Sequence, residues 1–495
     1  MRCHRRPLAE NVGSANGWLQ SIQFMLPLSM KDDSALARQE DAEVLFLLGN
    51  RRLEDGDSDG AEACFREAFQ LDPQCAEACA NLALMLERRG VADEAEACYR
   101  QALALNPKMA GCLSNLGNLL VNQKRLGEAE QAYLRTLEFA PEWPVAWTHL
   151  GALYASMQRE NEAERCHRRA IEIDQGYATA RFNLSYLLLR QGRFDEGWQC
   201  MEARDWYAKL AALVSCPRWQ GEALAGKSLL IGFEAGHGDM IQLCRYVPLL
   251  KAQGAARVDL LCHPGLVSLF ETLGGVDDVL SCAEDLPASG WHFWTPPFSI
   301  PFHLKTRLET IPAKLPYLHA DAARAEQWRQ RLPAGGLRVG LAWKGNPRYE
   351  NDAERSLPSL RLLSPLREVP NVCFVSLQKG AGEDEAEKLA REWPLCNFGP
   401  ELEDFADTAS VIANLDLVIS VDTAVAHLAG ALGKHCWLLL PDYMTDWRWL
   451  TGREDTPWYP GVMRLFRQSA RRDWVEAVAQ VREALEQFSR EFVGV

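Results

Sequence analysis

Hydrophobic and small residues recur with a fixed period through the first part of the chain. Between positions 42 and about 205 a helical pattern returns every 34 residues. Proline holds one slot of the repeat at Pro73, Pro107 and Pro141. Small residues hold two further slots, namely Ala61, Ala95, Ala129 and Ala163, and then Gly49, Ala83, Gly117, Gly151 and Ser185. Because helices pack closely only where a small side chain lies at the contact, the pattern predicts antiparallel helix pairs with a turn at each proline.

The pattern changes near positions 206–219, where the helical periodicity ends. Short apolar runs then predict strands at 227–233, 257–262 and 277–280 and, beyond a hinge at Gly335-Gly336, at 337–343, 372–377, 417–421 and 436–440. Helices are predicted between them and after them, at 240–253, 265–273, 383–392, 405–414, 424–432 and 474–492. This alternation indicates two α/β halves, each built on a parallel sheet with right-handed crossovers. Ligands of such sheets bind outside the carboxyl ends of the strands.

Composition narrows the class of protein. A chain of 495 residues exceeds what one core supports, so several domains are expected. The net charge of −14 argues against nucleic acid as the main partner. The 15 cysteines form no paired CxxC array, and Cys64, Cys98, Cys166 and Cys200 share one register of the repeat, which is typical of buried thiols in a reducing compartment. No signal peptide and no apolar span of membrane length is predicted, so we expect a cytoplasmic protein without a transmembrane segment.

The stretch 417–433 is the most informative for chemistry. A β-branched apolar run at 417–421 reads as a buried strand, Asp422 and Thr423 are good helix N-caps, and Gly433 follows the expected helix. The first N–H groups of that helix, around Thr423 and Ala424, would point out of the carboxyl edge of the sheet and attract an anion. His427 is four residues after Thr423 and would flank the same anion. The alternative is an ordinary strand–turn–helix with a capping Asp and a surface His.

Several motifs together resemble known families. The repeat of the first half is similar to tetratricopeptide repeats, in five units. The loop Gly236-x-Gly238-Asp239 and the stretch Asp422-Thr423-Ala424-Val425-Ala426-His427-Leu428-Ala429 resemble motifs of the ADP-heptose:lipopolysaccharide heptosyltransferase family, although His237 stands where that family more often has an apolar residue. The segment 339–347, with Asn351-Asp352, Arg355-Ser356, Asp446-Trp447-Arg448-Trp449-Leu450 and Thr456-Pro457-Trp458-Tyr459-Pro460, resembles bacterial proteins that join tetratricopeptide repeats to such a domain.

The resemblance implies a fold and a reaction. The fold is an all-α tetratricopeptide solenoid followed by an α/β, GT-B-like domain of two Rossmann-like halves, of which the C-terminal half holds a nucleotide sugar. The reaction is inverting glycosyl transfer without a metal, with the nucleotide-diphosphate sugar as substrate and no further cofactor. The repeats would hold a protein or peptide in their groove. Protein O-linked N-acetylglucosaminyltransferases share this combination of repeats and GT-B domain.

Inverting transfer needs a base and a stabiliser for the leaving diphosphate. Asp239 is the first candidate for the base, because its loop faces the cleft and Gly236 and Gly238 let a substrate approach closely. Asp239 could equally cap the helix that follows. His237 is the alternative base.

The remaining candidates would hold the donor. Lys344 or Arg355 would bring positive charge after the first strand of the C-terminal half, Arg355 through bidentate contacts. Ser376 and Gln378 end a strand on the same edge and could touch the base or ribose. The alternative interpretation is that Lys344 and Arg355 are charged surface residues without a role in binding the donor.

These arguments predict four regions and two functions. The regions are an N-terminal extension that is partly disordered at 1–41, the repeats at 42–205, the first half of the GT-B domain at 206–334, and its nucleotide-sugar-binding half with a final helix at 335–495. The first function is a glycosyltransferase whose repeats recruit the acceptor, a protein or a cell-envelope glycan. The alternative is a non-catalytic scaffold with a degenerate transferase domain. The sugar, the nucleotide, the acceptor and the oligomeric state are left open.

Overall fold

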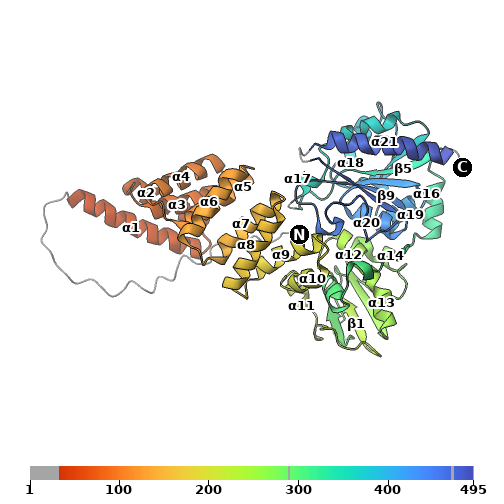
Figure 1. Ribbon diagram of the computed structural model, residues 1–495, viewed down its shortest axis with the longest axis horizontal. Helices are drawn as coiled ribbons and strands as arrows, with labels where there is room; N and C mark the ends of the chain where they lie inside the picture. The colour runs from red at the N-terminus through yellow and green to blue at the C-terminus, as the bar shows by residue number, and fades with distance from the viewer. Residues whose placement is uncertain (1–32, 288–289, 350, 470–472, 494–495) are drawn as a thin grey trace. The chain divides into compact units, whose positions relative to one another are not determined.

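The computed structural model describes residues 33–287, 290–349, 351–469 and 473–493 (Figure 1). The chain divides into two compact units between Asn183 and Leu184. The expected extension at 1–41 lies outside the described residues up to position 32, and positions 33–41 are already part of the first helix, α1 (Asp33–Glu54).

The first unit is all helical and follows the predicted repeat. Its further helices are α2 (Ser58–Leu71), α3 (Ala76–Arg88), α4 (Ala92–Leu105), α5 (Ala110–Asn122), α6 (Leu126–Phe139), α7 (Pro144–Ser156) and α8 (Glu160–Ile173). Consecutive helices pack in pairs, and each repeat proline follows the second helix of a pair, as predicted. The division of the chain falls within α9 (Ala178–Arg190).

The small residues lie where the helices of a pair touch. A Cβ added at Gly49 would stand 2.7 Å from the Phe65 ring, and one at Gly117 would stand 2.5 Å from the Tyr133 ring. Ala61, Ala95, Ala129 and Ala163 are fully buried. The physical reason given for the repeat is therefore confirmed. Of the four cysteines expected to be buried, Cys64 and Cys166 are buried, whereas Cys98 and Cys200 are half-buried.

The second unit contains two parallel sheets. The smaller sheet has the order β3-β2-β1-β4, from β1 (Ser228–Ile231), β2 (Arg257–Cys262), β3 (Asp278–Ser281) and β4 (Phe293–Thr295). Three of these strands match the prediction, and β4 is additional. The predicted helix at 240–253 is instead α12 (His237–Leu243), a 3₁₀ turn η1 (Cys244–Tyr246) and α13 (Val247–Ala252). Pro248 is the second residue of α13, in the first turn, where a ring without an N–H is tolerated. The helix predicted at 265–273 is the shorter α14 (Val267–Phe270).

The larger sheet has the order β10-β9-β8-β5-β6-β7. Its strands are β5 (Leu337–Ala342), β6 (Val372–Ser376), β7 (Cys396–Asn397), β8 (Leu417–Val421), β9 (His435–Leu440) and β10 (Met463–Arg467). The helices associated with this half are α16 (Ala322–Arg329), α17 (Asp352–Arg355), η5 (Leu360–Glu368), α18 (Glu383–Leu389), α19 (Phe405–Ala413), α20 (Ala424–Ala431) and α21 (Trp474–Val493). One hydrophobic core joins the sheet, η5 and the last helix α21. The edge strands β7 and β10 were not predicted.

The last repeat helices are built into the second unit. Trp198, on α10 (Phe194–Met201), is buried, donates a hydrogen bond to the carbonyl of Thr306 over 3.2 Å, and meets the Trp447 ring edge-on at 5.2 Å. Directly after α10, the fully buried guanidinium of Arg204 binds the fully buried carboxylate of Glu234. The second unit begins at Leu184, so α10 belongs to this unit although the sequence analysis included it in the repeats at 42–205.

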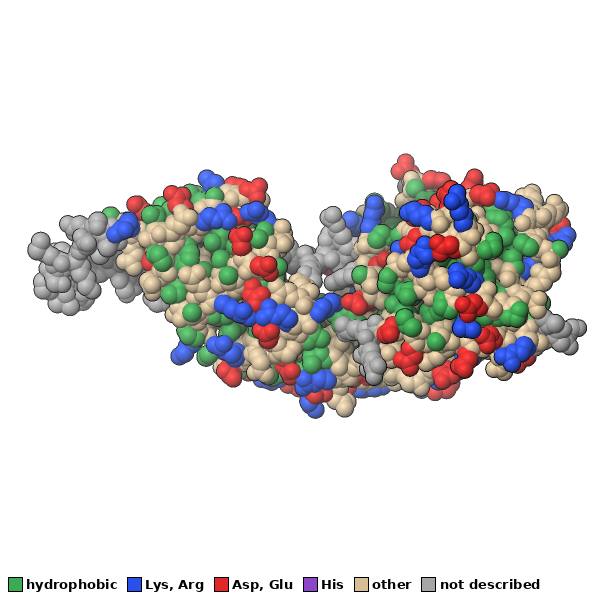
Figure 2. Space-filling model, turned by 90° about the horizontal axis from the view of Figure 1, so that it is seen from above, with side chains coloured by type: hydrophobic (Ala, Val, Ile, Leu, Met, Phe, Trp, Pro, Cys, Tyr) green, Lys and Arg blue, Asp and Glu red, His purple; other side chains and the backbone are tan. Residues whose placement is uncertain are grey.

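None of the helices within the described ranges combines the length and the apolar character needed to cross a bilayer. On the face seen in Figure 2, acidic and basic side chains are interspersed rather than gathered by sign.

Candidate functional site

Two helix starts meet between the sheets of the second unit. Helix α12 follows β1 in the smaller sheet, and α20 follows β8 in the larger one, and the two helices pack against each other (Figure 1). The contact is close because Gly238 has no side chain: a Cβ there would lie 3.4 Å from Ala424 Cα and 2.8 Å from His427 Cδ2. The glycine loop and the late helix, predicted from distant parts of the sequence, are thus neighbours.

The start of α20 is accessible. Thr423 is its N-cap, and Asp422, Thr423 and Ala424 are half-buried rather than covered. The Thr423 hydroxyl lies 3.2 Å from the hydroxyl of Ser420, which ends the preceding strand. The N–H groups of the first helical turn have no partner within the helix, so they remain able to bind an anion.

Asp239 has the capping role, one of the two roles that the sequence left open, and it also forms an ion pair. One carboxylate oxygen accepts the backbone N–H of Gly236 over 2.8 Å and so caps α12. The other oxygen binds the guanidinium of Arg448. Burial raises the pKa of Asp239 above its ordinary value, and the positive charge of Arg448 opposes that rise. The side chain is 24% exposed, so a substrate can still reach it.

Arg448 is a central residue that the sequence analysis named only within the motif Asp446-Trp447-Arg448-Trp449-Leu450, without a role. It lies in the 3₁₀ turn η7 (Trp447–Trp449), after β9, and its side chain is only 5% exposed. The guanidinium contacts both halves: Asp239 and Gln242 from α12, and Asp446, over 2.9 Å, from its own loop. The signal in the sequence is that motif, which resembles a segment of bacterial proteins that join tetratricopeptide repeats to a heptosyltransferase-like domain.

Asp422 belongs to the same group of charges. Its carboxylate accepts the indole N–H of Trp449 over 2.9 Å. Burial, and secondly the nearby charge of Asp446, raise the pKa of Asp422 to about 6, although Arg355 and Arg448 oppose the shift. Trp449 and Trp447 are themselves fully buried, so they brace the joint between loops and do not offer a stacking surface for a sugar.

Arg355 reaches this group from the loop after β5. Its guanidinium packs over Gly345, where a Cβ would stand 2.6 Å from Nη2, and it lies 4.3 Å from the centre of the Tyr349 ring. Its Nε donates to Asp352 over 3.1 Å. Its positive charge opposes the rise in the pKa of both Asp239 and Asp422.

Three other predicted donor residues have structural partners. The ammonium of Lys344 binds Glu385. Gln378 is buried; its amide oxygen accepts the N–H groups of Trp343 and Lys344, and its NH₂ donates to the carbonyls of Lys344 and Ala381. Ser376 is fully buried beneath it. Since these polar groups already have partners, Ser376 and Gln378 shape the loop after β5 instead of facing a donor, contrary to expectation.

Both predicted histidines lie in ring stacks. His237 is stacked between His263, at 4.6 Å, and Phe405, at 5.2 Å, and burial lowers the pKa of His237 to about 4. His427 is 5% exposed, 2.8 Å from the hydroxyl of Tyr459, and stacked on Trp449. Burial and nearby arginines hold the pKa of His427 well below its ordinary value. His427, on α20, is therefore a buried, neutral ring. From the sequence, this ring was expected to flank the anion at the start of the helix.

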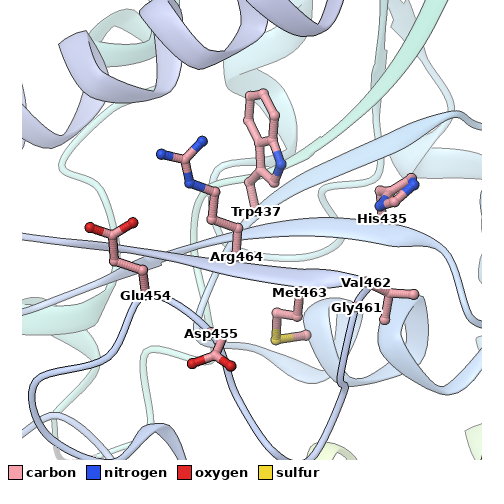
Figure 3. A pocket seen from close by; sticks show the side chains of 8 residues that line it. All are labelled: His435, Trp437, Glu454, Asp455, Gly461, Val462, Met463 and Arg464. Atoms are coloured by element: carbon pink, nitrogen blue, oxygen red, sulfur yellow. The ribbon is translucent and has the colours of Figure 1, made fainter.

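A hollow of about 450 Å³ lies elsewhere in the second unit. It surrounds the amino ends of β9 and β10, and its lining residues are His435, Trp437, Glu454, Asp455, Gly461, Val462, Met463 and Arg464 (Figure 3). Trp437 and Arg464 project to one side of the strands and Met463 to the other. The hollow lies at the wrong strand ends for a nucleotide and carries two carboxylates, so it does not replace the site at the helix starts.

Comparison with known families agrees with this division. Residues 363–436 match the family model of glycosyltransferase family 9 (heptosyltransferase). The second unit thus contains a glycosyltransferase family 9 domain. The match runs from η5 to the start of β9; it includes β8 and α20 but stops short of Asp239, Arg355 and Arg448. In the first half, residues 42–75 match the tetratricopeptide repeat and residues 74–174 the middle TPR-like domain of cilia and flagella-associated protein 70.

Individual known proteins resemble parts of this chain. Protein FlbA of Caulobacter vibrioides is 29% identical over 338 residues, which are 62% of this chain and 55% of that protein. The chain therefore spans about half the length of this curated relative. Among solved structures, Pseudomonas aeruginosa PilF is 25% identical with a TM-score of 0.32, over 34% of this chain and 76% of that one. YrrB, a TPR protein with an unusual peptide-binding site, is 20% identical with a TM-score of 0.29, over 34% of this chain and 90% of that one.

Proposed function

We propose that the chain is a glycosyltransferase that moves a sugar from a nucleoside diphosphate to an acceptor hydroxyl, with inversion at the anomeric carbon and without a metal or other cofactor. The observation that carries this proposal is the meeting of Asp239 with the accessible start of α20. These parts come from different halves of the unit, yet Gly238 brings their helices into contact. A base and an anion site then face one another at the carboxyl ends of two sheets.

Each step has a group to perform it. Asp239 takes the proton of the acceptor hydroxyl; both carboxylate oxygens already accept one hydrogen bond, and each retains a further lone pair. The acceptor oxygen forms its bond to the anomeric carbon on the face opposite the diphosphate. The bond from that carbon to the phosphate oxygen breaks, and its electron pair leaves with the diphosphate. Free N–H groups at Thr423 and Ala424 and the guanidinium of Arg355 stabilise the leaving charge.

The repeats would recruit the acceptor, a protein or a cell-envelope glycan. A hollow of about 400 Å³ lies between α1 and the start of α3 and is lined by Gln39, Glu40, Ala42, Glu43, Phe46, Asp72, Cys75 and Glu77. Its four carboxylates favour a basic segment with an apolar anchor. We place the reaction in the cytoplasm, because nearly all described thiols are at least half-buried side chains without a disulfide partner.

A donor panel tests the proposal. Thermal shifts with ADP-, UDP- and GDP-sugars should reveal one nucleotide that stabilises the protein, by about 2.7 kcal/mol at a concentration 100 times the dissociation constant. With that donor, Asp239→Asn should keep the stabilisation, and its turnover rate should fall by about 10²- to 10⁴-fold. Asp455→Asn is the control, since it alters an exposed aspartate that is ion-paired with Arg453 and belongs to neither helix start.

Two outcomes would contradict the proposal in different ways. If no nucleotide sugar shifts the unfolding temperature, the chain is better described as a scaffold with a degenerate transferase domain. If a donor binds and Asp239→Asn turns it over as fast as the native protein, the enzyme exists but its base is another group.

A further inference from the structure

The guanidinium of Arg448 has a different acceptor for each of its nitrogens. Nε donates to the amide oxygen of Gln242, Nη2 to Asp239, and Nη1 to Asp446 over 2.9 Å. Asp446 also accepts the backbone N–H of Arg448 over 3.0 Å, which holds the turn closed. A planar fork with three directed acceptors has one orientation, and two of its acceptors belong to the opposite half of the domain.

Aromatic rings fix the guanidinium from its faces. It lies 4.6 Å from the centre of the Trp447 ring and 5.5 Å from that of Phe298. Trp447 is in turn held edge-on by Trp198, from the last repeat helix, and by Trp458 at 5.8 Å. The arginine therefore cannot swing toward a donor without breaking buried hydrogen bonds, and a diphosphate ligand of this residue would leave Asp239 without its partner.

We propose that Arg448 is a positioning residue for the reaction. It orients the carboxylate of Asp239 toward the acceptor, and it makes this orientation depend on the contact between the two halves. This inference rests on the proposed function, in which Asp239 is the base. Arg448 does not touch the donor; Arg355 and the start of α20 do that. Arg448 differs from the surface ion pairs of the chain because it binds both Asp239, the proposed base, and Gln242, which lies on the same helix α12.

The charges around Asp239 predict the direction in which its pKa changes when a neighbouring charge is removed. The groups that act on its carboxylate are Arg448 and Arg355, which favour the ionised form, and Asp446, which disfavours it. The phenols of Tyr186 and Tyr349 also lie within electrostatic range of Asp239. Removing the charge of Arg448 should therefore raise the pKa of Asp239, and removing that of Asp446 should lower it.

The test measures the titration of Asp239 directly and needs no donor. In ¹³C-labelled protein, the carboxyl signal that disappears in Asp239→Asn is followed against pH. Arg448→Gln should move its midpoint upward by about 1–3 pH units, the usual effect of one adjacent opposite charge. Asp446→Asn should move it downward. Arg453→Gln, an exposed ion-paired arginine of the following segment, should leave it unchanged.

Kinetics with the donor identified by the panel then separates positioning from binding. Arg448→Gln should lower kcat and shift the acid limb of kcat/KM upward with the titration, while the donor KM stays within about threefold. Arg448→Lys should restore the acid limb but not kcat, because an ammonium keeps the charge and loses the fork.

Several results would overturn the inference. A donor KM raised more than tenfold at an unchanged acid limb would make Arg448 a donor ligand. If the titration midpoint of Asp239 is the same in Arg448→Gln and in Asp446→Asn as in the native protein, the contact between Arg448 and Asp239 is merely structural. Should Arg448→Gln not fold, Asp446→Asn still decides, since only a coupled carboxylate moves in the opposite direction. Full turnover by Asp239→Asn would refute the base and leave the titration result standing.

Discussion

One methyl group at Gly238 should separate the two helix starts. In Gly238→Ala the new Cβ would stand 2.8 Å from Cδ2 of His427. Carbon atoms pack at about 3.5–4.0 Å, so the gap must open by roughly 0.7 Å or more. His427 cannot yield, because it is buried, bound to the Tyr459 hydroxyl and stacked on Trp449. Helix α12 must therefore move, and Asp239 moves with it.

The cost follows from overpacking. An extra methyl in a close-packed contact destabilises by about 1–3 kcal/mol. A displacement of reacting groups approaching 1 Å lowers turnover by up to about 100-fold. We expect Gly238→Ala to lose stability in that range in urea unfolding and to lose about 10- to 100-fold in kcat, with nucleotide binding at α20 less affected.

The matched control is Gly265→Ala, at the same joint between the halves. A Cβ there would meet only Phe405, at an ordinary distance of 3.9 Å. This variant should unfold and turn over like the native protein. If Gly238→Ala is equally silent in both assays, the two helix starts are not in the contact described, and the argument for a site between them fails.

Three further predictions address other parts of the second unit. Glu234→Gln should cost about 1–3 kcal/mol in urea unfolding, because it removes the fully buried one of the two carboxylates that bind Arg204 and leaves only Glu202; an unchanged free energy of unfolding would contradict this. Arg355→Ala should weaken binding of the nucleoside diphosphate about 10- to 150-fold by calorimetry, the value of a charged hydrogen bond of 1.5–3 kcal/mol, whereas Arg348→Ala, exposed on the same loop, should not. His237→Phe should lessen the loss of stability on acidification: the folded pKa of about 4 lies below the ordinary 6.5, so native stability falls as pH drops through that window, and an unchanged slope would refute the assignment.

The arrangement of local elements was largely predictable. The repeat follows from helix contacts that demand small residues at a constant spacing, and the structure places Gly49 and Gly117 against aromatic rings as required. Strand β2 has its predicted bounds, because four of its six residues are apolar and Gly254 and Pro264-Gly265 flank it. Short strands without such a run, β4 and β7, were missed, since sheet neighbours rather than their own residues make them strands.

The candidate site was predictable only in part. The capping positions of Asp239 and Thr423 were predictable, because a turn glycine and a helix cap are identified from adjacent residues. Gln378 and His427 were misplaced, because the same polar side chain can face a ligand or complete a buried network, and only the packing around it decides. Arg448 was missed for the same reason: its partners Asp239 and Gln242 are about two hundred positions away in the chain.

By itself, the sequence determined the repeated helix pairs, the alternation of strands and helices, and the helix start that can hold an anion, since each depends on residues a few positions apart. The tertiary structure alone decided which helix starts meet, which arginine holds the candidate base, and that the last repeat helix packs with the transferase domain. Those features depend on contacts between distant segments, whose burial sets the charge, orientation and partners of each side chain.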